Sequence, residues 1–259
     1  MTFDEIHAKV GHVPFITEQN ARILYDLIIK EKATNILELG IAHGTATCYM
    51  AAAIEELGGG KITAVDLLSV KDSFKPSAEE QLESTGLSKY AEVVRMHTGY
   101  NWFLHNEIVK QTKDDICQEV YDLCIIDGPK NWTIDGAAFF MVDKLLKQDA
   151  WIIFDDYHWT YSKADQKRES TDGITHRSLS DEERVTPQIT EVFEYLVKQH
   201  PNYSNFVVME KTDWAMAQKA KTDQKTYQVI YRKEQPNPNA HQPKLLPRIY
   251  HGIKRRVFK

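Results

Sequence analysis

The chain has 259 residues, enough for one large α/β domain or two small ones. Its 42% hydrophobic and 27% charged residues are ordinary for a globular protein, and no apolar run reaches the roughly 18–20 residues of a membrane span. Residues 244–259 hold six Lys or Arg and no acid, so the net charge of −5 leaves about −11 on residues 1–243, which disfavours nucleic acid as a partner.

Cysteine use and the first residues bear on the cellular compartment. The three cysteines, Cys48, Cys117 and Cys124, form no CxxC pair, which argues against a disulfide framework or a zinc cluster. The first ten residues carry two acids early and lack an apolar core, so we expect no signal peptide. Together these features predict a cytoplasmic protein.

Helix and strand patterns alternate along the chain. Apolar residues at helical spacing, with favourable caps or helix formers, predict helices over 17–32, 45–57, 77–85, 134–146 and 186–200. The last of these should start with Thr186 at the N-cap and Pro187 at the first helical position. Short apolar runs predict strands over 35–40, 61–66, 91–97, 121–127 and 150–156, and residues 205–210 and 213–219 suit an antiparallel hairpin. This alternation predicts an α/β fold with a mostly parallel sheet covered on both faces.

Three regions are expected along the chain. Residues 1–34 form an N-terminal helical segment, residues 35–220 form the main domain, and residues 221–259 form a C-terminal extension. The extension contains a Pro-rich run at 235–243, which is typical of a flexible linker.

Carboxylates end two of the predicted strands. Asp127 closes the apolar run 121–127, and Lys130 follows it by three residues. Asp155 and Asp156 close the run 150–156. Parallel sheets bind ligands outside the carboxyl ends of their strands, although an Asp at such an end can also simply cap the next turn or helix.

A glycine-containing turn follows the first strand. Glu38 lies near the end of this strand, Gly40 and Gly44 follow before a helix, and Asp66 ends the next strand. Glycines let a ligand approach the backbone, and the Asp carboxylate can accept both hydroxyls of a ribose. The pattern predicts a nucleoside cofactor other than NAD, because the GxGxxG fingerprint would need a glycine at Ala42.

These motifs resemble a known family over roughly residues 20–220. "LELGIAHGTAT" (37–47) followed by "AVD" (64–66) looks like the first two motifs of class I S-adenosylmethionine-dependent methyltransferases. The resemblance implies a Rossmann-like seven-stranded sheet with helices on both faces and a C-terminal antiparallel hairpin. "IIDGPK" (125–130) and "FDD" (154–156) are similar to the metal-dependent O-methyltransferases of the catechol and caffeoyl-CoA type and to bacterial antibiotic-sugar O-methyltransferases.

The resemblance also implies roles for individual residues. S-adenosylmethionine would be bound by Glu38, Gly40, Gly44, Thr45, Asp66, Gly99, Tyr100 and Asp127. A divalent cation, most naturally Mg²⁺, would be held by Asp127, Asp155 and Asp156. Lys130 is the favoured base and His158 the alternative. Plainer roles stay open: Lys130 could pair with Asp127 on the surface, Glu38 with a helix N-terminus, and Tyr100 could be core.

The sequence thus predicts a metal-dependent O-methyltransferase acting on a small polyhydroxylated acceptor, such as a sugar or nucleotide sugar. Two alternatives stay open. A non-catalytic S-adenosylmethionine-binding protein would not need the clustered acids, and a metal-dependent hydrolase on an α/β scaffold would leave Glu38 and Asp66 unexplained. A homo-oligomer also stays open.

Two segments outside the motifs carry expectations. The long polar segment 157–185 is expected to form a lid over the acceptor, with Tyr157, His158 and Trp159 as stacking or hydrogen-bonding surfaces, unless it is a plain surface insert. The basic, partly apolar tail could lie on an anionic membrane surface. Docking of the tail on the acidic body, its own or a partner subunit's, is favoured instead.

Overall fold

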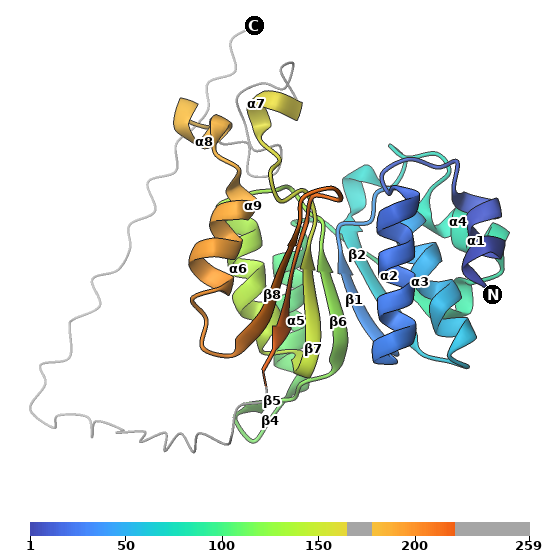
Figure 1. The fold of residues 1–259 in the computed structure, drawn as a ribbon. Coiled ribbons are helices and arrows are strands. Elements are labelled where there is room, and N and C mark those ends of the chain that lie inside the picture. Colours follow the sequence, from blue (N-terminus) through green and yellow to red (C-terminus); the bar gives the residue numbers. More distant parts are fainter. Residues whose placement is uncertain (165–177, 221–259) are drawn as a thin grey trace, which may run out of the picture. The chain divides into compact units, whose positions relative to one another are not determined.

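Seven strands form one mixed sheet in the computed structural model, which describes residues 1–164 and 178–220 (Figure 1). The strand order is β3-β2-β1-β6-β7-β9-β8; the first five are mutually parallel, and β9 runs antiparallel to both β7 and β8. Their bounds are β1 Asn35–Leu39, β2 Lys61–Leu67, β3 Ala91–Met96, β6 Tyr121–Ile126, β7 Leu146–Phe154, β8 Tyr203–Met209 and β9 Trp214–Lys219. A separate two-stranded ribbon pairs β4 Thr112–Lys113 with β5 Ile116–Cys117. The predicted seven-stranded sheet and its closing hairpin are confirmed.

Helices cover both faces of the sheet (Figure 1). One face carries α1 Phe3–Val10, α2 Glu18–Glu31, α3 Thr45–Glu56 and α4 Ala78–Thr85. The other carries α5 Tyr100–Gln111, α6 Trp132–Asp143 and α9 Gln188–Glu191, which continues as a π-helical turn, η3 Val192–Val197. The remaining short helices are η1 Leu68–Val70, η2 Ser88–Tyr90, α7 Tyr161–Ala164 and α8 Asp181–Val185.

The core consists of two apolar clusters, one on each side of the sheet. Ile36 belongs to the cluster under α1–α4, and its neighbour Leu37 belongs to the cluster under α5 and α6. This is the alternation expected of a strand that is buried on both faces. Helices α1 and α2 pack in the first cluster and lie in the same compact unit, Met1–Asp223, as the sheet.

The sequence-based prediction of where the helix over 186–200 begins is wrong. Helix α9 begins at Gln188, and Pro187 stands at its N-cap with no side-chain capping bond. Thr186 is the C-cap of α8 instead, and its hydroxyl donates to the Glu182 carbonyl at 2.8 Å. The capping side chain is therefore used by the preceding helix. Helix α1 lies within the N-terminal segment 1–34, and helices α5, α7 and α8 and the β4–β5 ribbon are additions to the individually predicted elements.

Some expectations fall on parts of the chain that the structure does not describe. The linker and basic tail, and residues 165–177 of the expected lid, lie outside the described residues. Across residues 1–164 and 178–220, no helix has both the length and the apolar character needed to cross a bilayer.

Candidate active site

Strand register brings three segments of the predicted site to one edge of the sheet. Leu39 of β1 pairs with Ile126 of β6, and Ile126 pairs with Phe154 of β7. The next residue of each strand continues this ladder: the backbone N–H of Asp127 donates to Leu39 O at 2.8 Å, and that of Asp155 donates to Ile126 O at 3.1 Å. The glycine turn after β1 and both acidic strand ends therefore lie side by side. The order of the strands also reverses between β1 and β6, which is where open α/β sheets bind ligands.

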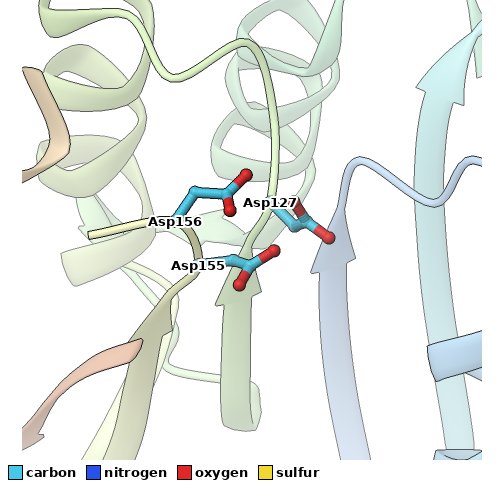
Figure 2. A group of neighbouring side chains, drawn as sticks. All are labelled: Asp127, Asp155 and Asp156. Carbon is cyan, nitrogen blue, oxygen red and sulfur yellow. The ribbon is translucent and has the colours of Figure 1, made fainter. Parts of the chain in front are cut away.

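Three carboxylates converge at this edge (Figure 2). Asp127, Asp155 and Asp156 each offer an oxygen, and these atoms all lie within 4.8 Å of one another. Asp156 has a positive φ of 57°, an uncommon backbone conformation for a residue other than glycine. Trp214 at the start of β9 donates from Nε1 to Asp155 Oδ1 at 2.6 Å, which fixes the orientation of that carboxylate. The predicted metal ligands are thus brought together.

Lys130 lies among these carboxylates. Its side chain is buried and contacts the carboxylate of Asp127, and its Nζ lies 3.3 Å from Asp156 Oδ2 and 3.8 Å from Asp155 Oδ2. Burial by itself would lower the pKa of Lys130, but the three carboxylate charges outweigh it and hold the pKa well above its ordinary value. The lysine is therefore a charged ammonium in this arrangement.

One ammonium does not balance the cluster. Burial, and then the charge of Asp155, raise the pKa of Asp127 well above its ordinary value although Lys130 is in contact with it. With all three carboxylates ionised, the cluster and its one ammonium would carry a net charge of −2, which a divalent cation would neutralise. Carboxylate oxygens are also the ligands that Mg²⁺ prefers. The donor set fits the predicted cation.

The loop that carries Lys130 is held at several points. Lys130 itself has a positive φ of 61°, and the preceding Pro129 carbonyl accepts from the Tyr161 hydroxyl at 2.9 Å. The backbone N–H of Asn131 donates to Asp135 Oδ2 at 2.6 Å, and the Asn131 side chain caps α6. The conformation of the loop is therefore set by tertiary contacts.

Asp135 is a buried acid that the sequence analysis missed. It lies in the first turn of α6 and accepts a hydrogen bond from the Tyr100 hydroxyl. Burial raises the pKa of Asp135 to about 6. Its sequence signal is an acid in the first turn of a largely apolar helix. Tyr100 is buried in the core at the start of α5, directly after Gly99, and this placement favours the core alternative over adenine stacking.

His158 is positioned by the turn of the β8–β9 hairpin. Asp213 Oδ1 accepts from the backbone N–H of His158 at 3.0 Å and lies 2.6 Å from its Nδ1. The Asp213 carbonyl also accepts from the backbone N–H of Tyr157 at 2.8 Å. The sequence gives no spacing signal for Asp213 or Trp214, because only the closing hairpin brings them to the ends of the parallel strands.

Tyr157 does not offer the stacking surface expected of it. Its side chain is buried, and its hydroxyl donates to Glu194 Oε1 at 2.9 Å. The ring of Trp159 instead packs edge-on against Tyr161, with ring centroids 4.6 Å apart. His158 is the residue of the expected aromatic surface whose side chain is half-exposed.

Gly40 and Gly44 both stand where neighbouring atoms leave no room for a Cβ. Gly40 has a φ of 92°, and a Cβ there would lie 2.1 Å from the carbonyl oxygen of Asp127. Gly44 has a φ of 74°, and a Cβ there would lie 2.5 Å from Cβ of Ala78. A side chain at either position would collide with its neighbour in addition to straining the backbone. The glycine turn is thus packed tightly against the acidic end of β6.

Asp66 and Thr45 support this turn. Asp66 Oδ2 accepts from the backbone N–H groups of Ile41 at 3.1 Å and Ala42 at 3.0 Å. Each carboxylate oxygen has more than one acceptor site, so these bonds leave capacity for ribose hydroxyls. Thr45 is buried at the start of α3 and accepts from Gln81 Nε2 at 3.2 Å.

Glu38 is a buried carboxyl group beneath the turn. Thr47 Oγ1 donates to Glu38 Oε2 at 2.5 Å, and the side chain is almost fully enclosed. Burial raises the pKa of Glu38 to about 8, although the Thr47 hydrogen bond opposes this shift. A cationic group bound next to Glu38 would favour its ionised form.

The chain is similar to known methyltransferases in sequence pattern and in fold. Residues 37–157 match the family described as a methyltransferase domain. A search of curated protein sequences gives no match.

Several methyltransferases of known structure have a similar fold. The O-methyltransferase of Bacillus cereus, solved with S-adenosylhomocysteine, is 21% identical with a TM-score of 0.58, over 85% of this chain and 90% of that one. TomG of Streptomyces achromogenes, an O-methyltransferase of tomaymycin synthesis solved with S-adenosylmethionine, is 16% identical with a TM-score of 0.54, over 85% and 88%. The S-adenosylhomocysteine-bound methyltransferase PaMTH1 of Podospora anserina is 13% identical with a TM-score of 0.58, over 85% and 87%. Residues 37–157 are therefore similar in sequence to a methyltransferase domain, and the chain shares the fold of these S-adenosylmethionine-dependent methyltransferases, as the predicted resemblance implied.

Proposed function

We propose that the protein transfers the methyl group of S-adenosylmethionine to a hydroxyl oxygen of a small polyhydroxylated acceptor, such as a sugar or nucleotide sugar. In this proposal a divalent cation is held by Asp127, Asp155 and Asp156. The cofactor residues are those proposed from the sequence except Tyr100, whose buried hydroxyl donates to Asp135; Glu38 would face the methionine amino group and Asp66 the ribose.

One observation carries the proposal: the carboxylate cluster lies directly against the glycine turn. Gly40 is so close to Asp127 that no Cβ fits between them. A cofactor bound on the turn would therefore lie next to the cluster. This arrangement suits transfer between a bound cofactor and an acceptor oxygen, because both reactants would be held in one place.

The chemistry of methyl transfer to oxygen explains the cluster. A hydroxyl is a poor nucleophile near neutral pH, so its proton must be removed. A divalent cation held by the carboxylates would lower the pKa of an acceptor hydroxyl bound to it. The chain itself would orient the cation ligands, since Trp214 fixes Asp155 by a hydrogen bond.

Two side chains remain proposals for the base. Lys130 lies in the cluster but is held charged by three carboxylates. His158 is half-exposed, and the bond of Asp213 to its Nδ1 leaves Nε2 as the nitrogen that can accept a proton. Steady-state kinetics of Lys130→Met and His158→Ala separate them: loss of the base lowers kcat by about 100-fold or more with little change in KM.

The test of the proposed function is S-adenosylhomocysteine release from S-adenosylmethionine with a panel of sugars, nucleotide sugars and catechols. We expect turnover with a polyhydroxylated acceptor, its loss in EDTA and its return with excess Mg²⁺. Asp155→Asn should lose activity, whereas Asp72→Asn, which changes an exposed acid, should not. Turnover that survives EDTA would remove the cation from the mechanism. Cofactor binding without turnover on any acceptor would favour a non-catalytic binding protein.

A further inference from the structure

The ammonium group of Lys130 occupies the space on which the three carboxylates converge. It contacts Asp127 and lies within 4.0 Å of an oxygen of both Asp155 and Asp156. These are the three residues whose oxygens lie close enough together to hold a metal ion. The lysine and a cation held by these residues would therefore compete for the same three carboxylates.

The position of the lysine follows from its environment. The Lys130 side chain is only 8% exposed, so its charge has little access to water and depends on the carboxylates for compensation. The carboxylates in turn would repel one another without a positive charge between them. Each group therefore stabilises the other in the folded chain when no other cation is bound.

We infer that Lys130 is a resident counter-cation of this site, and that a divalent cation binds the three carboxylates by displacing its ammonium group. This inference rests on the cation site of the proposed function. It gives Lys130 a role in setting the affinity and charge selectivity of the site. A monovalent cation would gain little from the exchange, because it replaces one positive charge with another.

Hydrogen bonds restrain the backbone of this loop more than the Lys130 side chain. The backbone on both sides of Lys130 is held by hydrogen bonds from Asp127 N–H to Leu39 O, from the Tyr161 hydroxyl to Pro129 O, and from Asn131 N–H to Asp135. The four-carbon stem of the lysine is flexible by comparison. Displacement therefore requires only rotation of one side chain, with the carboxylates kept in place.

Calorimetric titration of the full chain with Mn²⁺ and with Mg²⁺ tests the inference. Wild type is compared with Lys130→Met, which removes the competing charge, and with Lys130→Arg, which retains it. Lys163→Met is the matched control, because it removes an exposed lysine after the second acidic strand end that is not paired with the cluster. We expect Lys130→Met to bind Mn²⁺ at least about tenfold more tightly, and Lys163→Met to stay within about threefold of wild type.

Several outcomes would overturn the inference. Affinity that is unchanged or weaker in Lys130→Met would show that the lysine does not compete. If neither wild type nor Lys130→Met bound Mn²⁺ or Mg²⁺, the proposed cation site would be ruled out as well. Titration of the same samples with S-adenosylhomocysteine reports separately on the methyltransferase proposal.

If Lys130→Met does not fold, NMR spectroscopy of the wild-type protein can still test displacement of the ammonium group. In ¹⁵N-lysine-labelled protein, the buried Lys130 ammonium should give a slowly exchanging signal in EDTA that disappears when Mg²⁺ is added. Persistence of that signal at saturating Mg²⁺ would contradict displacement.

Discussion

Burial of Glu38 should make the stability of the fold depend on pH. The carboxyl group is 2% exposed and has one side-chain donor, Thr47 Oγ1. Its pKa is about 8 in the folded chain, against an ordinary value of 4.5. Between these two values the unfolded chain is ionised at this residue while the folded chain still holds the proton. Unfolding therefore releases a proton, and the free energy of unfolding falls as the pH rises through this range.

The size of the effect follows from the two pKa values. The interval from 4.5 to about 8 corresponds to roughly 5 kcal/mol of unfolding free energy as an upper bound. Glu38→Gln removes the titration but keeps the shape of the side chain and an oxygen that can accept from Thr47. The variant should therefore be more stable than wild type by several kcal/mol above pH 8, and this advantage should shrink toward pH 5.

Urea unfolding of wild type and Glu38→Gln at a series of pH values measures this difference. Glu83→Gln, which changes an exposed acid on α4, is the control and should follow wild type. The reasoning is refuted if Glu38→Gln has the same pH slope as wild type. Saturating S-adenosylhomocysteine tests the proposed cofactor role in the same assay, because an ammonium group beside Glu38 would favour its ionised form and flatten the slope of wild type.

Two further substitutions probe the edge of the sheet. Gly40→Ala should lower the free energy of unfolding by about 3 kcal/mol or more, because its Cβ would collide with Asp127 O; Gly86→Ala, with a φ of 78° and open space around it, should cost only about 1–2 kcal/mol. Equal losses in urea unfolding would contradict this. Trp214→Phe should weaken Mn²⁺ binding about 10–100-fold in calorimetry by removing the donor to Asp155, with S-adenosylhomocysteine affinity unchanged. Unaltered Mn²⁺ affinity would argue against that positioning role.

Much of the architecture was predictable because its signals are local. Apolar runs of strand length and helical periodicity indicated every strand of the seven-stranded sheet and its C-terminal hairpin. The glycine turn was also readable, since Gly40 and Gly44 stand between a strand and a helix; the structure adds their positive φ and their close neighbours. Acids at strand ends predicted a site, because parallel strands all present their carboxyl ends at one edge.

Helix caps and boundaries were harder to predict, because a side chain that can cap one helix can also bond to a neighbouring helix, and the sequence does not say which it does. Thr186 suits an N-cap, but its hydroxyl bonds the carbonyl of Glu182 and so belongs to the preceding helix. Tyr100 could be read as a cofactor contact or as core until the packing of α5 against α6 placed its hydroxyl on the buried Asp135.

The tertiary structure alone decided how the acidic site is completed. Trp214 and Asp213 orient Asp155 and His158 from more than fifty residues away, and only the antiparallel pairing of β9 with β7 brings them there. The sequence placed Lys130 near Asp127, but its contact with all three carboxylates requires the register between β6 and β7. Local sequence thus determined which residues stand at the strand ends, whereas strand pairing determined which charges meet, because electrostatic partners are selected by distance in space.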